Sequence, residues 1–321
     1  MTRTFRHLLA LIAALAIVAA GSGLASAAPS SGAQGAGISA MPVYRGHVQQ
    51  AKGARSRPSR NNNLSSHGGA VQTTPKVYIS WWGLEWGSGF TTGGYSSAQA
   101  QTYNLDFFGN VGGSAWNNVV KQYCQNVPSG TQDCSKVSGA QQITNPTGQL
   151  AGAWNDPTAV PSKPTQSQIA AAAVRLQQHF GALDPNATYM VFTPTGKSMS
   201  GFATQWCAWH SSTTTSSGKL AYAYIPYMPD AGTSCGRNFV NATNNTYGNG
   251  WFDGFSVVAG HEYSEAETDP FPSSGWVDKG GAENADKCAW SSSSGNITLS
   301  GRQFAVQPTW SNASSGCATS A

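Results

Sequence analysis

The residues best suited to catalysis lie in the short stretch AGHEYSEAETDP, at positions 259–270. Residues four apart on an α-helix share one face, so His261 and Glu265 would lie one turn apart, with Glu262 about 100° away. The H-E-x-x-H zinc helix has this arrangement: its first and fifth residues bind the metal, and its second acts as a general base. The pattern therefore predicts a metal-binding helix with His261 and Glu265 as ligands and Glu262 as the base.

The fifth position of this pattern is a glutamate rather than a histidine, and a carboxylate is an accepted zinc ligand. Glu265, Glu267 and Asp269 also lie near the C-terminal end of the predicted helix, where the helix dipole disfavours each negative charge by about 0.3–1 kcal/mol. A nearby cation would offset this cost, but exposure to water and salt would screen most of it. Two interpretations therefore stay open, a metal site and a solvated acidic helix.

A third metal ligand must come from outside this pair, and the candidates are Asp269, Glu283 and Asp286. The last two lie in the sequence GGAENADKC, which ends at Cys288. A disulfide at this cysteine would hold their loop rigid, whereas without a metal the segment would be a glycine-rich surface loop. Zinc is the expected metal. Calcium is an alternative, although the spacing does not match an EF-hand.

His210, in the sequence CAWH, is a further candidate for the site, as a ligand or as a proton donor. A histidine beside aromatic residues is more often structural, so both interpretations stay open. Other chemistries have weaker support, because an even cysteine count in an oxidising compartment argues against Cys207 as a nucleophile. A glycosidase pair of Glu262 and Asp286 would rest on residue type alone.

The elements that position these residues can be predicted from capping and periodicity. The acidic helix is expected over 255–268, with Asp253 as its cap and its end forced by Pro270. A second helix is expected over 165–180, where Thr165 or Ser167 can cap it and Gly181 ends it. Further helices are expected over 96–108 and 116–124, and strands over 77–83, 189–193 and 220–227. Strands and helices mix without strict alternation, which predicts a single α+β domain with a mixed sheet and a zincin-like active-site helix.

Six cysteines favour disulfides if the chain leaves the cytoplasm. Sequence cannot fix their connectivity, but pairing neighbours along the chain gives three modest loops. These pairs are Cys124 with Cys134, Cys207 with Cys235, and Cys288 with Cys317.

The N-terminal region has the pattern of a secreted precursor. Arg3 and Arg6 precede a short apolar run and the small residues Ala25-Ser26-Ala27, so residues 1–27 are the expected signal peptide. Residues 28–74 are polar and basic, and we expect a disordered linker or a propeptide that shields an acidic active site. The folded domain is expected over 75–321. No later segment approaches the roughly 20 apolar residues of a transmembrane helix, so no membrane association is expected after signal removal.

The net charge of +4 does not indicate a nucleic-acid partner. All seven basic residues before position 75 lie in the expected signal peptide or in the segment 28–74, and the first acidic residue is Glu85. From position 75 onward there are 11 Lys and Arg against 14 Asp and Glu, a balance of about −3. Nucleic-acid binding is therefore not expected.

The chain resembles a group of secreted actinobacterial and related microbial proteins that share the block Gly-His-Glu-x-x-Glu-x-x-Thr-Asp-Pro, here residues 260–270. The resemblance continues through residues 275–278, Glu283 and residues 286–288, and it closes with VQPTWSN at 306–312. It spans about residues 75–318. More distantly the chain is similar to the plant EXORDIUM, or phosphate-induced, extracellular proteins. That family lacks the His-Glu pair of positions 261 and 262, so a catalytic interpretation rests on the microbial block alone.

Together these patterns predict a secreted, monomeric, zinc-dependent metallopeptidase that acts on a peptide or protein substrate. The alternative is a non-catalytic extracellular protein that binds cell-wall glycan, in which the acidic cluster is structural and organised around calcium.

Overall fold

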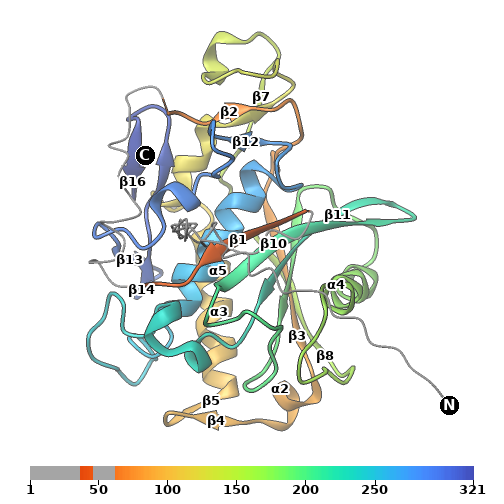
Figure 1. Cartoon of the computed structure of the whole chain (residues 1–321), viewed down its shortest axis with the longest axis vertical. Coiled ribbons are helices and arrows are strands. Elements are labelled where there is room, and N and C mark those ends of the chain that lie inside the picture. Colours follow the sequence, from red (N-terminus) through yellow and green to blue (C-terminus); the bar gives the residue numbers. More distant parts are fainter. Residues whose placement is uncertain (1–36, 46–61) are drawn as a thin grey trace, which may run out of the picture. The chain divides into compact units, whose positions relative to one another are not determined.

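The structure, a computed structural model, describes residues 37–45 and 62–321, so the predicted signal peptide lies outside the described residues. Its centre is a six-stranded mixed sheet with the strand order β1-β10-β11-β9-β3-β8 (Figure 1). The strands, in this order, are Ile38–Pro42, Trp206–Thr215, Gly218–Ile225, Ala187–Phe192, Lys76–Trp82 and Leu150–Asp156. β1, β10 and β11 pair antiparallel, and the other neighbours pair parallel. The predicted α+β class with a mixed sheet is confirmed.

Helices cover both faces of the sheet (Figure 1). Alternate residues of β3, Val77, Ile79 and Trp81, belong to one hydrophobic core together with residues of α3 (Ser97–Val111) and α5 (Asp253–Thr268). A second core joins the opposite face of the sheet to α4 (Gln166–Phe180). The helix that carries the acidic block is therefore packed against one face of the central sheet.

The predicted helix over 165–180 is confirmed, and its ends form as capping chemistry requires. Thr165 and Gln168 make a capping box, and Gly181 ends the helix with a φ of 108° that a side chain would disfavour. The helix predicted over 116–124 is instead the shorter 3₁₀ helix η1 (Asn117–Gln122), which ends as the chain enters strand β6 at Cys124.

Helix α5 ends at Thr268, before Asp269 and Pro270, as predicted. Asp253 does not cap it. The Asp253 carboxylate accepts hydrogen bonds from the backbone N–H groups of Val240, Asn241 and Gly250, so it holds the preceding loop against the start of the helix.

Part of the segment 28–74 has regular structure, contrary to the prediction that it is disordered. Residues Ile38–Pro42 form β1 at the edge of the main sheet, and Ser65–Ser66 form β2. The reason is pairing with distant segments: β1 pairs with β10, and β2 pairs with β12 (Trp276–Val277).

The remaining elements are short. Four further two-stranded sheets pair β4 (Thr91–Thr92) with β5 (Tyr95–Ser96), β6 (Cys124–Gln125) with β7 (Gln141–Gln142), β13 (Gly295–Leu299) with β14 (Arg302–Val306), and β15 (Thr309–Ser311) with β16 (Gly316–Ala318). The short helices are α2 (Leu84–Ser88), η2 (Cys134–Lys136), η3 (Met228–Cys235) and η4 (Asp286–Cys288). All three predicted disulfides are present: Cys124–Cys134, Cys207–Cys235 and Cys288–Cys317.

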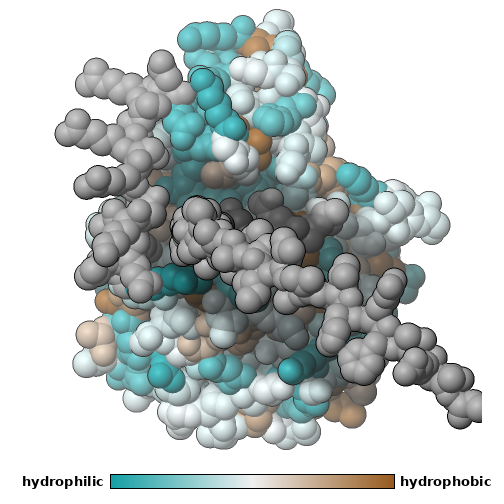
Figure 2. All heavy atoms as spheres, viewed as in Figure 1, coloured by the Kyte–Doolittle hydropathy of each residue, from teal (hydrophilic) through white to brown (hydrophobic). Residues whose placement is uncertain are grey.

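Few large hydrophobic side chains of the described residues are exposed. Among large hydrophobic side chains of the described residues, Leu84 and Phe180 are the exposed ones. On the face drawn in Figure 2, hydrophobic residues are scattered among hydrophilic ones. In the described part of the chain, no helix has both the length and the apolar character needed to cross a membrane.

Candidate metal centre

The acidic helix is buried along its whole length, so the interpretation as a solvated acidic helix is wrong. The side chains of Glu262, Glu265 and Glu267 are each 0% exposed. A buried carboxylate is costly unless it is protonated, hydrogen-bonded or paired with a cation. The partners of these carboxylates therefore determine what the site can do.

His261 is oriented by Gln307, which follows strand β14. The side-chain Nε2 of Gln307 donates to the carbonyl oxygens of Ala285 and Pro308, at 2.9 and 3.3 Å. This fixes the amide so that its oxygen faces Nδ1 of His261, at 3.3 Å. Because an amide oxygen only accepts, Nδ1 carries a proton and Nε2 of the neutral imidazole is left with its lone pair.

The free nitrogen of His261 faces two carboxylates. Its Nε2 lies 3.0 Å from Oε1 of Glu265 and 3.7 Å from Oδ1 of Asp286, and it has no hydrogen bond of good geometry. These three residues form a group whose ligand atoms all lie within 4.8 Å of one another. The predicted pair of His261 and Glu265 is therefore brought together with Asp286, one of the three candidates for the third ligand.

The loop that carries Glu283 and Asp286 is tied to helix α5 and to the C-terminal strands. The backbone N–H of Asp286 donates to Oε1 of Glu265 at 2.9 Å, and the Asn284 side chain donates to the Ser264 carbonyl at 3.0 Å. The disulfide Cys288–Cys317 closes the loop on its other side, as the sequence suggested.

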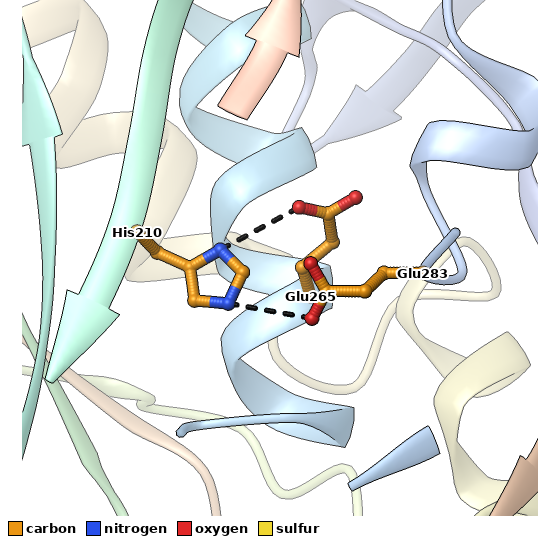
Figure 3. Close-up of side chains that lie close together, drawn as sticks. All are labelled: His210, Glu265 and Glu283. Carbon is orange, nitrogen blue, oxygen red and sulfur yellow. Dashed lines mark ion pairs between the residues drawn. The ribbon is translucent and has the colours of Figure 1, made fainter. Parts of the chain in front are cut away.

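His210 lies in a second group with Glu265 and Glu283 (Figure 3). It comes from β10, where it shares a sheet face with Ala208, which packs in the core on the α5 side. Its Nδ1 lies 3.5 Å from Oε2 of Glu265, and its Nε2 lies 3.4 Å from Oε1 of Glu283. His210 is thus part of the site and not a histidine packed among aromatic residues.

Glu262 points toward His210 and toward strand β1. Its Oε2 lies 3.2 Å from Nδ1 of His210, and its Oε1 accepts a hydrogen bond from the backbone N–H of Met41 at 3.4 Å. Met41 is itself fully buried. Strand β1, which Figure 1 shows beside α5, therefore contacts the predicted base through this hydrogen bond.

The structure does not bring the Asp269 carboxylate into either group. Its oxygens accept hydrogen bonds from the backbone N–H groups of Ser273, Ser274 and Gly275, at 2.6, 3.1 and 2.7 Å. Asp269 thus organises the turn after α5, while its backbone carbonyl lies 3.2 Å from Nε2 of His210.

The electrostatics show that this cluster binds protons tightly when no metal is present. Burial alone would lower the pKa of His261, but the Glu265 carboxylate outweighs it and raises the pKa to about 10. Burial opposes ionisation of Glu265, but His261 and His210 lower its pKa to about 2. Burial and the charge of Glu265 raise the pKa of Asp286 to about 7. Burial also raises the pKa of Glu262 and of Glu283. A metal ion would displace these protons.

The roles of Gln307 and Met41 were missed at the sequence level. Gln307 lies in VQPTWSN, a stretch noted for its resemblance to the microbial group, but nothing in its residue type signals a hydrogen bond to a histidine. Met41 acts through its backbone N–H, which no sequence pattern marks.

Comparisons of the chain with family models, with curated proteins and with solved structures found no match. The residues and their geometry must therefore carry the functional argument.

Proposed function

We propose that this protein is a secreted zinc-dependent hydrolase that cleaves peptides, with His261, Glu265 and Asp286 as zinc ligands and Glu262 as the general base. The observation that carries the proposal is the buried Nε2 of His261, which faces two carboxylates without a hydrogen bond. Secretion is supported by the signal-peptide pattern and by three disulfides, which persist in oxidising compartments.

The donor atoms fit zinc better than calcium. Calcium takes six to eight oxygen ligands, whereas zinc accepts imidazole nitrogen together with carboxylate oxygen. Two ligands at about 2.0–2.1 Å from a tetrahedral zinc ion are about 3.4 Å apart. The observed separations of 3.0 and 3.7 Å from Nε2 of His261 lie on either side of this value. The bond from Gln307 to the other ring nitrogen is the support that zinc-binding histidines usually have.

These residues would hold a zinc ion, which would supply a Lewis acid that polarises a carbonyl group and acidifies water. Glu262 would take the proton from that water, because it follows His261 on the same helix and its Oε2 lies 3.2 Å from Nδ1 of His210, beside Glu265. Burial raises its pKa, which brings a carboxylate toward the range where it can accept and release a proton near neutral pH. His210, 3.2 Å away, orients Glu262.

Strand β1 must move before a substrate can reach Glu262. The Met41 N–H already donates to this carboxylate, and His210, His261 and Glu265 are each 0% exposed. This closure supports the interpretation of the N-terminal segment as a propeptide. Arg55, Arg57 and Arg60 lie between β1 and β2 in the sequence, where a trypsin-like cut would separate β1 from the rest of the chain.

The test is hydrolysis of a quenched-fluorescent peptide library before and after limited trypsin treatment. We expect activity to rise after the cut, to vanish with a chelator and to return with zinc. Glu262→Gln should abolish turnover but keep the zinc, whereas Glu267→Gln, the same change on the same helix outside the ligand group, should retain both. A Glu262→Gln variant with full activity would sink the mechanism.

A second function is favoured by the burial of the whole site, which also suits a structural metal in a non-catalytic extracellular protein that binds cell-wall glycan. Sugar-binding surfaces usually present aromatic side chains. Of the 11 tryptophans, Trp154 and Trp251 are the two that are not buried, so they are the candidates for contact with a glycan. This alternative predicts no peptide turnover in any form of the protein. It also predicts saturable retention on insoluble cell-wall glycan that Trp154→Ala or Trp251→Ala weakens and Glu262→Gln does not.

A further inference from the structure

We propose that the centre binds two divalent metal ions, with Glu265 as the carboxylate that bridges them. His261 and Asp286 complete the first site, and His210 and Glu283 complete the second. The inference rests on the proposed function for the first site and adds a second ion to it.

The first argument is the position of Glu265 in both ligand groups. Both groups contain Glu265, and within each group the ligand atoms lie within 4.8 Å of one another. The two oxygens of Glu265 face different histidines: Oε1 lies 3.0 Å from Nε2 of His261, and Oε2 lies 3.5 Å from Nδ1 of His210. A carboxylate that offers one oxygen to each side is the bridge that two ions about 3.5–4 Å apart require.

The second argument comes from polar atoms that a single ion would leave without a partner. Oε2 of Glu265 and both carboxylate oxygens of Glu283 are buried and accept no hydrogen bond of good geometry. An ion held by His261, Asp286 and Oε1 of Glu265 would not contact these oxygens. Buried polar atoms are nearly always satisfied, so their accumulation beside His210 points to a second cation.

His210 has acidic groups at both ring nitrogens. Its Nδ1 lies 3.2 Å from Oε2 of Glu262 and 3.5 Å from Oε2 of Glu265. Its Nε2 lies 3.2 Å from the backbone carbonyl oxygen of Asp269 and 3.4 Å from Oε1 of Glu283. An ion would use only one of the two nitrogens, so the unpartnered oxygens of Glu265 and Glu283 carry the argument for the second site.

Charge balance favours two ions over one. Four carboxylates face the two histidines, and in the described part of the chain no Lys or Arg forms an ion pair with any of them: Glu262, Glu265, Glu283 and Asp286. Metal ligands and a general base must be deprotonated, so with neutral histidines the formal charge of these four is −4, which one dication reduces to −2 and two dications reduce to 0. Uncompensated charge in a buried site is costly, so the second ion removes what the first leaves.

The test uses the full chain, stripped with a chelator and reloaded with Zn²⁺ or with Mn²⁺. Elemental analysis after gel filtration should give two ions per chain, and the electron paramagnetic resonance spectrum of the Mn²⁺ form should be that of two coupled ions. Glu283→Gln should retain one ion and lose the coupling. Glu267→Gln, a matched change on α5 outside both groups, should keep two coupled ions.

The outcomes separate this inference from the proposed function. One uncoupled ion in the unmodified chain, lost in Asp286→Asn and kept in Glu283→Gln, would overturn the second site and leave the proposed function standing. No bound ion in a folded chain would overturn both. The measurement on the unmodified chain decides the matter even if a variant fails to fold.

Discussion

At the scale of single residues, Gln307 has the clearest influence on the proposed metal. Its two donated hydrogen bonds fix the orientation of its amide, and its oxygen then fixes which nitrogen of His261 is free. The residue touches no ion itself. Its effect on the site is to position a ligand.

Replacing Gln307 by leucine should therefore weaken zinc binding about 10–100-fold, because His261 loses the acceptor that holds its tautomer. The measurement is a competition titration against a chromophoric chelator. Gln303→Leu, a change at an exposed position of neighbouring strand β14, should leave the affinity unchanged. Equal affinity in the two variants would contradict the role of Gln307.

Glu267 should make the folded protein less stable as pH rises. Burial raises its pKa to about 8 from the usual 4.5, so the folded state holds a proton that the unfolded state releases. Its contribution is fully present below pH 4.5 and is lost as pH rises through about 8, by at most about 1.4 kcal/mol per pH unit. The free energy of unfolding of the Glu267→Gln variant, measured with denaturant, should decline less steeply between pH 4.5 and about pH 8. Glu85→Gln, at a side chain 40% exposed, should follow the unmodified protein.

Sequence reasoning identified most side chains of the centre but not their arrangement. His261, Glu262 and Glu265 follow from helical spacing, whereas the pairing of Glu265 with His210 depends on how β10 packs against α5. The choice among Asp269, Glu283 and Asp286 depended on loop paths. Asp269 turned its carboxylate to three backbone N–H groups just after the helix, which no spacing rule reveals.

At the scale of elements, the loop ending in η4 brings two of the proposed ligands, Glu283 and Asp286, beside α5, which supplies His261 and Glu265. The disulfide Cys288–Cys317 anchors the C-terminal end of this loop, whereas Cys124–Cys134 anchors no segment that carries a residue of either ligand group. The two bridges therefore offer a matched comparison.

Replacing Cys288 and Cys317 together by alanine should lower the free energy of unfolding by about 2–4 kcal/mol. It should also weaken zinc binding, because the loop must then be ordered when the metal binds. The double replacement of Cys124 and Cys134 should reduce stability with unchanged zinc affinity. Denaturant unfolding and a chelator competition measure the two quantities, and a loss of affinity in both variants would argue against a specific effect of the loop.

The elements also show what local sequence can and cannot specify. Helix α4 was predictable because its cap, apolar stripe and terminal glycine all lie within its own residues. Strand β1 was not, because Ile38-Ser39-Ala40-Met41-Pro42 is short and rich in small residues, and its stability comes from pairing with β10 about 170 residues later.

At the scale of the whole molecule, the proposed metal would compete with protons for one buried cluster. Without metal, His261 contributes stability below pH 6.5 that is lost as pH rises through about 10. Asp286, whose pKa is raised from 3.8 to about 7, likewise favours the folded state when protonated and loses that contribution as pH rises through about 7. Glu265 acts in the opposite sense, since its stabilisation is present above pH 4.5 and is lost as pH falls through about 2.

The metal-free protein should therefore lose stability between neutral pH and about pH 10. Zinc should raise the melting temperature more at pH 9 than at pH 6, because fewer protons oppose it. Thermal unfolding with and without zinc at both pH values measures this, with His261→Ala as the variant that should show no zinc effect. A larger zinc effect at pH 6 would contradict the proton competition.

The sheet order explains how distant segments form one centre, and it lay beyond sequence reasoning. Strand β10 lies between β1 and β11, its His210 faces Glu265 of α5, and Met41 of neighbouring β1 donates to Glu262 of the same helix. The fold class followed from the mixture of elements, but this order depends on long-range pairing. The closed position of β1 is a property of the whole assembly of sheet and helix.

The most direct test of the central claim is the zinc content of the secreted protein, purified without chelator, beside its His261→Ala variant. The proposed site predicts at least one zinc ion per chain in the unmodified protein and loss of that zinc in the variant. A folded, fully disulfide-bonded protein that contains no metal and binds none on titration would contradict it.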